Sequence, residues 1–200
     1  MLLLFVDNFN FSNKHSRMKN QIIKNWVPKP TQPVKVLIIA ENCPDETKYL
    51  YRTLSHNITS KGANNILNNV AKTFEINADS EFEKLNTFLK RRYFLIDSYL
   101  DGTTWDKTTK HHDIEELHNL ILTLKPEQIV FTCKRSNKKI LKLLINYEKN
   151  LINSNLKIVT NNTIKDEFNL PFVFSSISNR AYPLFDKEIK AAIKNNKLKF

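Results

Sequence analysis

The sequence predicts a single α/β domain built on a mainly parallel sheet. Short runs rich in apolar and β-branched residues alternate along the chain with longer segments that carry apolar residues at helical spacing. A strand, a helix and a second strand in succession require a crossover connection, which makes the sheet parallel and covers both of its faces. We therefore expect a three-layer α/β/α sandwich whose central sheet has roughly four strands.

Length and composition set the domain boundaries. The chain has 200 residues, of which 41% are hydrophobic, and this is enough for one core. Residues 19–26 are expected to form a short amphipathic helix, and the three prolines of residues 28–33 require an extended linker. We therefore divide the chain into an N-terminal extension, residues 1–33, and a single α/β domain, residues 34–200.

The first half of the domain contains two expected strands separated by two expected helices. Residues 34–40 are apolar apart from one lysine, which predicts a strand buried on both faces. Apolar residues at helical spacing predict helices over residues 63–76 and 81–89. Residues 93–96 form the second strong strand candidate, and this strand ends at Asp97.

The second half repeats this alternation. Asp113 can cap a helix that buries apolar residues as far as Leu124, and His118, at the boundary of its apolar face, is expected to be structural. The remaining expected elements are a strand at 128–133, a helix over 137–151, short strands at 156–160 and 171–174, and a helix over 185–193. In such sheets ligands bind beyond the carboxyl ends of the strands, so the residues that directly follow a strand are the candidates for a site.

The charge of the chain favours a polyanionic partner such as DNA. The net charge is +11, and from residue 134 onward 14 Lys and Arg stand against 5 Asp and Glu. However, 25 of the basic residues are Lys and only 6 are Arg, alongside abundant Asn and Ile, a bias expected of AT-rich coding. A nucleic-acid surface and compositional drift therefore both stay open.

Several classes of protein are excluded by what the sequence lacks. Its two cysteines, Cys43 and Cys133, fit neither a disulfide scaffold nor a zinc site, and we expect a cytoplasmic protein without a metal ion. Two glycines are too few for a Rossmann or P-loop phosphate site, and no cofactor is expected. The apolar start is short and interrupted by Asp7, so we expect no signal peptide and no membrane span, while Met1 and Met18 stay open as the initiator.

The turn Ala40–Pro44, after the first strand, is the most informative stretch. Glu41 at a strand end can orient a water or act as a general base, and Asn42 offers both a donor and an acceptor. Tyr49 and Tyr51 provide flat rings on which a base could stack. The alternative, which composition alone favours, is that the turn is only a turn and the tyrosines pack on the sheet edge.

Two further candidate positions follow strands. Asp97 places a second carboxylate at the same end of the sheet as Glu41, and environment can separate the acid strengths of such a pair. The alternative is that Asp97 accepts hydrogen bonds from loop amides. Ser175, Ser176 and Arg180 offer hydroxyls and a guanidinium for a phosphate clamp, and a solvated loop fits them equally well.

In their order and spacing these segments resemble the uracil-DNA glycosylase superfamily, particularly its poorly characterised branches. VLIIAENCP followed by KYLY resembles the family's first strand, which ends in G-E-x-P-P and precedes an aromatic R-Y-F-Y-like segment. YFLID resembles the second strand, with Asp97 at the position that contacts the base. PEQIVFTCK resembles the third strand, and LPFVFSS resembles the fourth strand with the loop that carries His-Pro-Ser in active members. The likeness covers roughly residues 34–193.

The resemblance implies a DNA glycosylase-like protein that hydrolyses the N-glycosidic bond of a flipped damaged or modified base. It implies catalytic roles for Glu41 and Asp97, base contacts from Asn42, Tyr49 and Tyr51, and phosphate contacts from Ser175, Ser176 and Arg180.

The chain departs from the family at four points. Ala40 stands where the family has glycine, Cys43 replaces a proline, Asp97 replaces the usual Asn, and no His lies near Ser175. An ionised Asp cannot donate a hydrogen bond to a uracil carbonyl, so Asp97 must be protonated or must meet an exocyclic amino group. Two alternatives therefore stay open, a catalytically inactive member that binds nucleic acid or nucleotide and a protein-interaction domain without a nucleic-acid role.

Overall fold

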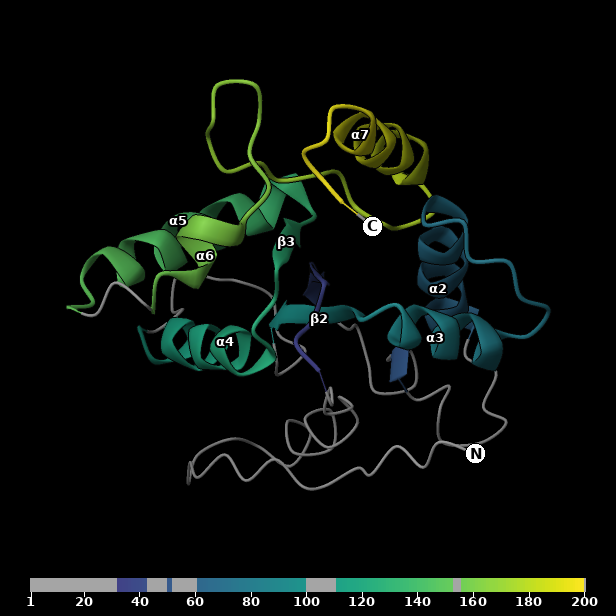
Figure 1. The fold of residues 1–200 in the computed structure, drawn as a ribbon, viewed down its shortest axis with the longest axis horizontal. Helices are drawn as coiled ribbons and strands as arrows, with labels where there is room; N and C mark the ends of the chain where they lie inside the picture. The colour runs from purple at the N-terminus through teal and green to yellow at the C-terminus, as the bar shows by residue number, and fades with distance from the viewer. Residues whose placement is uncertain (1–31, 43–49, 52–60, 100–110, 153–155, 200) are drawn as a thin grey trace.

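The structure, a computed structural model, describes residues 32–42, 50–51, 61–99, 111–152 and 156–199. Within these ranges the chain is an α/β protein with a three-stranded parallel sheet and six helices (Figure 1). The elements in chain order are β1 (Val36–Asn42), α2 (Lys61–Thr73), α3 (Glu81–Lys90), β2 (Tyr93–Tyr99), α4 (His111–Leu124), β3 (Gln128–Phe131), α5 (Lys134–Lys149), α6 (Ile158–Asn162) and α7 (Tyr182–Lys194).

The strand order is β2-β1-β3, which puts β1 in the centre of the sheet. The four residues from Val36 to Ile39 have no exposed surface, so the expectation of a strand buried on both faces is confirmed. Ala40 lies opposite Asp97 of β2, and Ile39 lies opposite Phe131 of β3. The three strands therefore end at one side of the sheet, which we call the carboxyl edge (residues 40–42, 97–99 and 131–133).

The helices lie in two groups on either side of the strands (Figure 1). One group consists of α2, α3 and α7, in which α2 packs on both of the others. The other consists of α4, α5 and α6, which pack on one another. Each group buries large apolar side chains, among them Leu85 and Phe185 in the first and Leu117 and Leu144 in the second. The sheet is thus screened from water over most of its area.

The strand expected at residues 156–160 is wrong, because this segment begins the helix α6. Its β-branched residues favour a strand on propensity alone. The carboxylate of Glu148 in α5, however, accepts hydrogen bonds from the backbone amides of Val159 and Thr160, both at 2.7 Å. Those amides are the ones a helix start leaves without a partner, so the distant carboxylate decides the local conformation.

The strand expected at residues 171–174 forms only in part. Val173 makes one isolated parallel bridge with Phe131, and the Phe174 amide donates to the Phe131 carbonyl at 2.7 Å. Pro171 bridges in the antiparallel sense to Lys165, which turns the chain away from the sheet. This segment extends the sheet beside β3 without becoming a fourth strand of it.

The helix expected at residues 19–26 and most of the proline-rich linker lie outside the described residues. In the described ranges, no helix has the length and apolar character that crossing a membrane requires.

Candidate functional site

A buried polar network holds the carboxyl edge together. Asn137, in the first turns of α5, has no exposed surface, and its Nδ2 donates to the carbonyls of Ile39 at 3.2 Å and Ala40 at 3.0 Å. The Ser98 hydroxyl lies 2.7 Å from Asn137 Oδ1 and 2.8 Å from the Glu41 carbonyl. One amide side chain and one hydroxyl therefore fix the ends of β1 and β2 against α5.

We expect Asn137→Ala to destabilise the fold by about 3 kcal/mol, because the substitution leaves buried carbonyls and a buried hydroxyl without their partner. The matched control is Asn146→Ala, the same change at an exposed position of the same helix. Urea denaturation of both variants measures the difference. A loss for Asn137→Ala no larger than that of the control would contradict a structural role for this network.

Asp97 occupies the end of β2 as a buried carboxyl group. Its side chain is 8% exposed, and burial raises its pKa from 3.8 to about 7. No residue in the described part of the chain donates a hydrogen bond to this carboxylate or forms an ion pair with it. Such a group exchanges its proton near neutral pH, and perturbed titration of this kind is typical of functional sites.

Glu41 and Asp97 do not converge on one point as the sequence suggested. Asp97 lies beside Ala40 and shares its face of the sheet, and successive residues of a strand point to opposite faces. The Glu41 side chain therefore points to the face of the sheet opposite the one that carries Asp97. The two carboxylates flank the carboxyl edge instead of forming a contact pair.

Cys133 lies near both Glu41 and Ser176. The Cys133 thiol forms hydrogen bonds with the side chains of Ser176 and Thr132, the latter with the Sγ and Oγ1 atoms 3.6 Å apart. Burial raises the pKa of this thiol despite those hydrogen bonds, and the nearby charge of Glu41 adds to the effect. Cys133 has a φ angle of 65°, in the left-handed region that a side chain disfavours. The structure thus gathers Glu41, Cys133 and Ser176 from three distant parts of the chain.

The loop after Val173 differs in part from the expected phosphate clamp. Ser175 is buried, and its backbone amide donates to Glu188 of α7 at 2.7 Å. Ser176 is half-buried and lies within 3.2 Å of the Ser178 hydroxyl, while Arg180 is exposed. Of the three expected phosphate ligands, Ser176 and Arg180 are accessible and Ser175 is part of the scaffold.

Tyr51 is a core residue whose hydroxyl binds the backbone of the edge strand β2. Its ring is 1% exposed, and its hydroxyl accepts from the Leu95 amide and donates to the Leu95 carbonyl, both at 2.9 Å. Stacking of a base on Tyr51 would require an exposed ring face. The Tyr51 ring is buried, so the prediction that it forms a stacking surface is wrong. Tyr49 and the side chain of Asn42 lie outside the described residues.

Sequence reasoning missed Asn137 and Ser98. A signal for Asn137 was present, because it precedes Ile140 by three residues and Leu144 by seven, which places an amide on the apolar face of a helix. Polar residues on such a face need buried partners. Ser98 carries no comparable signal, since a strand end tolerates serine in many environments.

The described residues contain no group of three or more His, Cys, Asp or Glu side chains placed to hold a metal ion. Comparisons with protein-family models, with curated proteins and with solved structures found no match to this chain.

Proposed function

We propose that this chain is a DNA glycosylase-like protein that binds a flipped base at the carboxyl edge. The observation that carries the proposal is the buried carboxyl group of Asp97, which has no hydrogen-bond donor or cation beside it among the described residues and whose pKa is raised to about 7. A general acid or base is most efficient when its pKa is close to the working pH. Asp97 meets that condition, and it lies near the carboxyl end of β2, on the side of the sheet where α/β proteins bind ligands.

Protonation also gives Asp97 the hydrogen-bond donor that an ionised carboxylate lacks and that contact with a base carbonyl requires. A protonated carboxyl group offers one donor and one acceptor, as the side-chain amide of Asn does, whereas a carboxylate only accepts. The family that this chain resembles has Asn at the corresponding position. In its protonated form Asp97 can therefore hydrogen-bond to a pyrimidine carbonyl and then transfer its proton to the departing base.

The position of Glu41 suits the other half of a hydrolysis. A water that displaces the base attacks the sugar carbon from the side opposite the departing base. Glu41 and Asp97 flank the carboxyl edge from opposite faces, so a nucleotide lying across the strand ends has one carboxyl group on each side. In this arrangement Glu41 accepts a proton from the water and Asp97 protonates the base as the N-glycosidic bond breaks.

Cationic side chains at the same edge support contact with DNA phosphates. Arg180 is exposed in the loop after Val173, and Arg135 is exposed in the first turn of α5, which starts at the carboxyl edge. The N-terminus of a helix also attracts anions. These groups belong to the two segments that follow β3 and Val173, and the second of these segments also carries the half-buried Ser176.

The distribution of the remaining charge favours the alternative of a protein-interaction domain. Of the twelve lysines from residue 134 onward, five lie in α5 and three in α7, and these two helices belong to different helix groups (Figure 1). Lys134 pairs with Glu188, and Lys190 pairs with Asp186 at 2.7 Å. The DNA contact proposed here is consequently local to the carboxyl edge and does not require one continuous basic face.

The test is base release from a panel of duplexes that each carry one damaged or modified base. We expect release from at least one duplex, and a loss of about a hundredfold or more for Glu41→Gln. The matched control, Glu167→Gln, makes the same change at an exposed position and should leave the rate unaltered. Salt-dependent duplex binding without release would identify an inactive nucleic-acid binder, and the absence of both would leave the protein-interaction alternative.

A further inference from the structure

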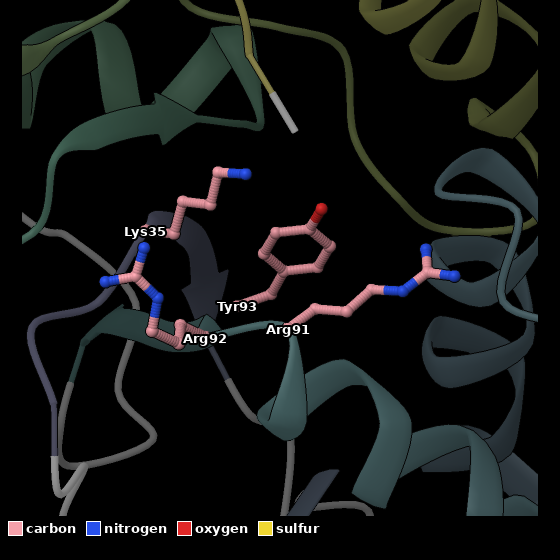
Figure 2. A pocket seen from close by; sticks show the side chains of 4 residues that line it. All are labelled: Lys35, Arg91, Arg92 and Tyr93. Carbon is pink, nitrogen blue, oxygen red and sulfur yellow. The ribbon is translucent and has the colours of Figure 1, made fainter.

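A basic pocket lies at the end of the sheet opposite the proposed site. Its volume is about 350 Å³, and it is lined by Lys35, Arg91, Arg92 and Tyr93 (Figure 2). These residues stand at the starts of β1 and β2, so we call it the amino-edge pocket. Figure 2 shows the Lys35 ammonium and the Tyr93 hydroxyl extending to the same side of the strands, with the two arginines reaching out to either side. Nothing in the proposed glycosylase chemistry uses this pocket.

The turn between α3 and β2 places the two arginines. The Arg92 amide donates to the Leu89 carbonyl at 2.8 Å, and its own carbonyl accepts from the Lys35 amide at 2.8 Å. Arg92 has a φ angle of 61°, a left-handed conformation that costs a non-glycine residue energy. Arg92 directly follows the C-cap of α3 at Arg91, a position where α-helices commonly end in this conformation.

The three cationic groups are only partly neutralised by the protein. Arg91 donates to the Phe74 carbonyl at 2.7 Å and to the Glu75 carbonyl at 3.4 Å, and no carboxylate of the described residues forms an ion pair with it. Arg92 pairs with Glu127 at 3.1 Å, and Glu127 is half exposed. Among the described residues, no carboxylate pairs with the half-buried Lys35 ammonium. In the described part of the chain, the Arg92–Glu127 pair is therefore the one salt bridge that these three cationic groups form.

The C-terminal segment adds two lysines to this edge. Gln128 begins β3 and lies level with Val36, close to Lys35 along β1. Its side chain donates to the Lys197 carbonyl at 3.2 Å and accepts from the Lys199 amide at 2.9 Å. Because Gln128 holds the backbone of both lysines, their side chains start from the same edge as the pocket.

We propose that the amino-edge pocket binds the phosphate group of a phosphorylated ligand. Arginine forks and a lysine ammonium are the groups with which proteins bind phosphate oxygens. Burial raises the pKa of Tyr93, so its hydroxyl stays neutral and does not repel an anion. Free pyrophosphate and the phosphates of a nucleic acid share this chemistry, and the experiment separates these two sources.

The test is a titration of the ¹⁵N-labelled full chain with inorganic pyrophosphate, followed through the amide resonances. We expect saturable shifts at Lys35, Arg92 and Tyr93, while Glu41 and Asp97 stay unchanged. The double variant Lys35→Gln/Arg92→Gly should weaken binding by about tenfold or more, since two charge-assisted contacts are lost. Glycine suits the left-handed φ at position 92, so the variant removes the charge without opposing the backbone.

The control variant Lys138→Gln/Lys142→Gln removes two exposed charges from α5 and should bind pyrophosphate like the unmodified chain. If a single-stranded oligonucleotide shifts the same resonances and binds more tightly than pyrophosphate, the phosphate comes from a nucleic acid. If pyrophosphate binds and the oligonucleotide does not, the ligand is a small phosphorylated molecule. Shifts that do not saturate, that map to the carboxyl edge, or that are equal in both double variants overturn the proposal. Because base release is measured at the carboxyl edge, the two proposals fail independently.

Discussion

Glu148→Ala is expected to destabilise the protein by about 4 kcal/mol, the cost typical of removing one partner from a fully buried polar pair. Glu148 has no exposed surface, and its carboxylate lies 3.0 Å from Nε2 of His118, which is itself 1% exposed. The same carboxylate accepts from the amides of Val159 and Thr160 and from the Thr160 hydroxyl, each at 2.7 Å. The substitution therefore removes the link between α4 and α5 and the start of α6 together.

The pH dependence of this effect has a definite sign. Burial alone would raise the pKa of Glu148, but the hydrogen bonds from His118, Thr160 and Val159 outweigh it and hold the pKa below its ordinary value of 4.5. A carboxyl group whose pKa is lower in the folded state stabilises the fold above the unfolded pKa. The difference between the unmodified chain and Glu148→Ala should therefore be full at pH 6 and shrink as the pH falls below 4.5 toward the lower pKa of the folded state.

Urea denaturation at several pH values measures this, with Glu115→Ala, an exposed glutamate of α4, as the control. A loss below about 1 kcal/mol at pH 6, the range of an exposed ion pair, would show that the buried carboxylate is not a structural link.

Asp97→Asn is expected to stabilise the protein at alkaline pH, by an amount that grows to about 4 kcal/mol. Burial raises the pKa of Asp97 from 3.8 to about 7, so the unfolded chain releases its proton more readily than the folded one. The contribution of Asp97 to the stability of the unmodified chain is therefore most favourable below about pH 4, and it declines as the pH rises to about 7. Asparagine has nearly the same shape and does not ionise, so the variant should lack this decline.

The experiment compares unfolding free energies of the two proteins between pH 4 and 9, with the exposed Asp79→Asn as the matched control. Parallel curves for the unmodified chain and Asp97→Asn would show that Asp97 is ionised without cost in the folded state. The Glu148 effect is lost below pH 4.5, whereas the Asp97 effect develops as the pH rises from about 4 to about 7, so the two are measured separately.

The sequence was sufficient to predict an α/β protein built on a parallel sheet. The continuous apolar run of β1 identifies a central strand, and the alternation of strands with helices identifies a parallel sheet. Asp97 follows from the same reasoning, because the residue that ends a parallel strand lies at the ligand-binding edge. These predictions depend only on local pattern.

The predictions that were wrong depend on contacts between distant segments. Residues 156–160 have the composition of a strand, and a buried carboxylate from α5 makes their last part a helix. Tyr51 has an aromatic ring of the kind on which a base could stack. Its hydrogen bond to Leu95, 44 residues further along the chain, places that ring in the core. The opposite faces of Glu41 and Asp97 follow from the pairing register, which no local pattern specifies.

The hydroxyl of Tyr51 also has a consequence for association between molecules. In the described sheet β2 is an edge strand, and the unpaired amide and carbonyl groups of such a strand can recruit a strand from another chain. Tyr51 occupies the amide and the carbonyl of Leu95 at once, as a neighbouring strand would, but it offers no backbone on which a further strand could add. The Tyr51 hydroxyl thus takes the two hydrogen bonds at Leu95 that a strand added from another molecule would need.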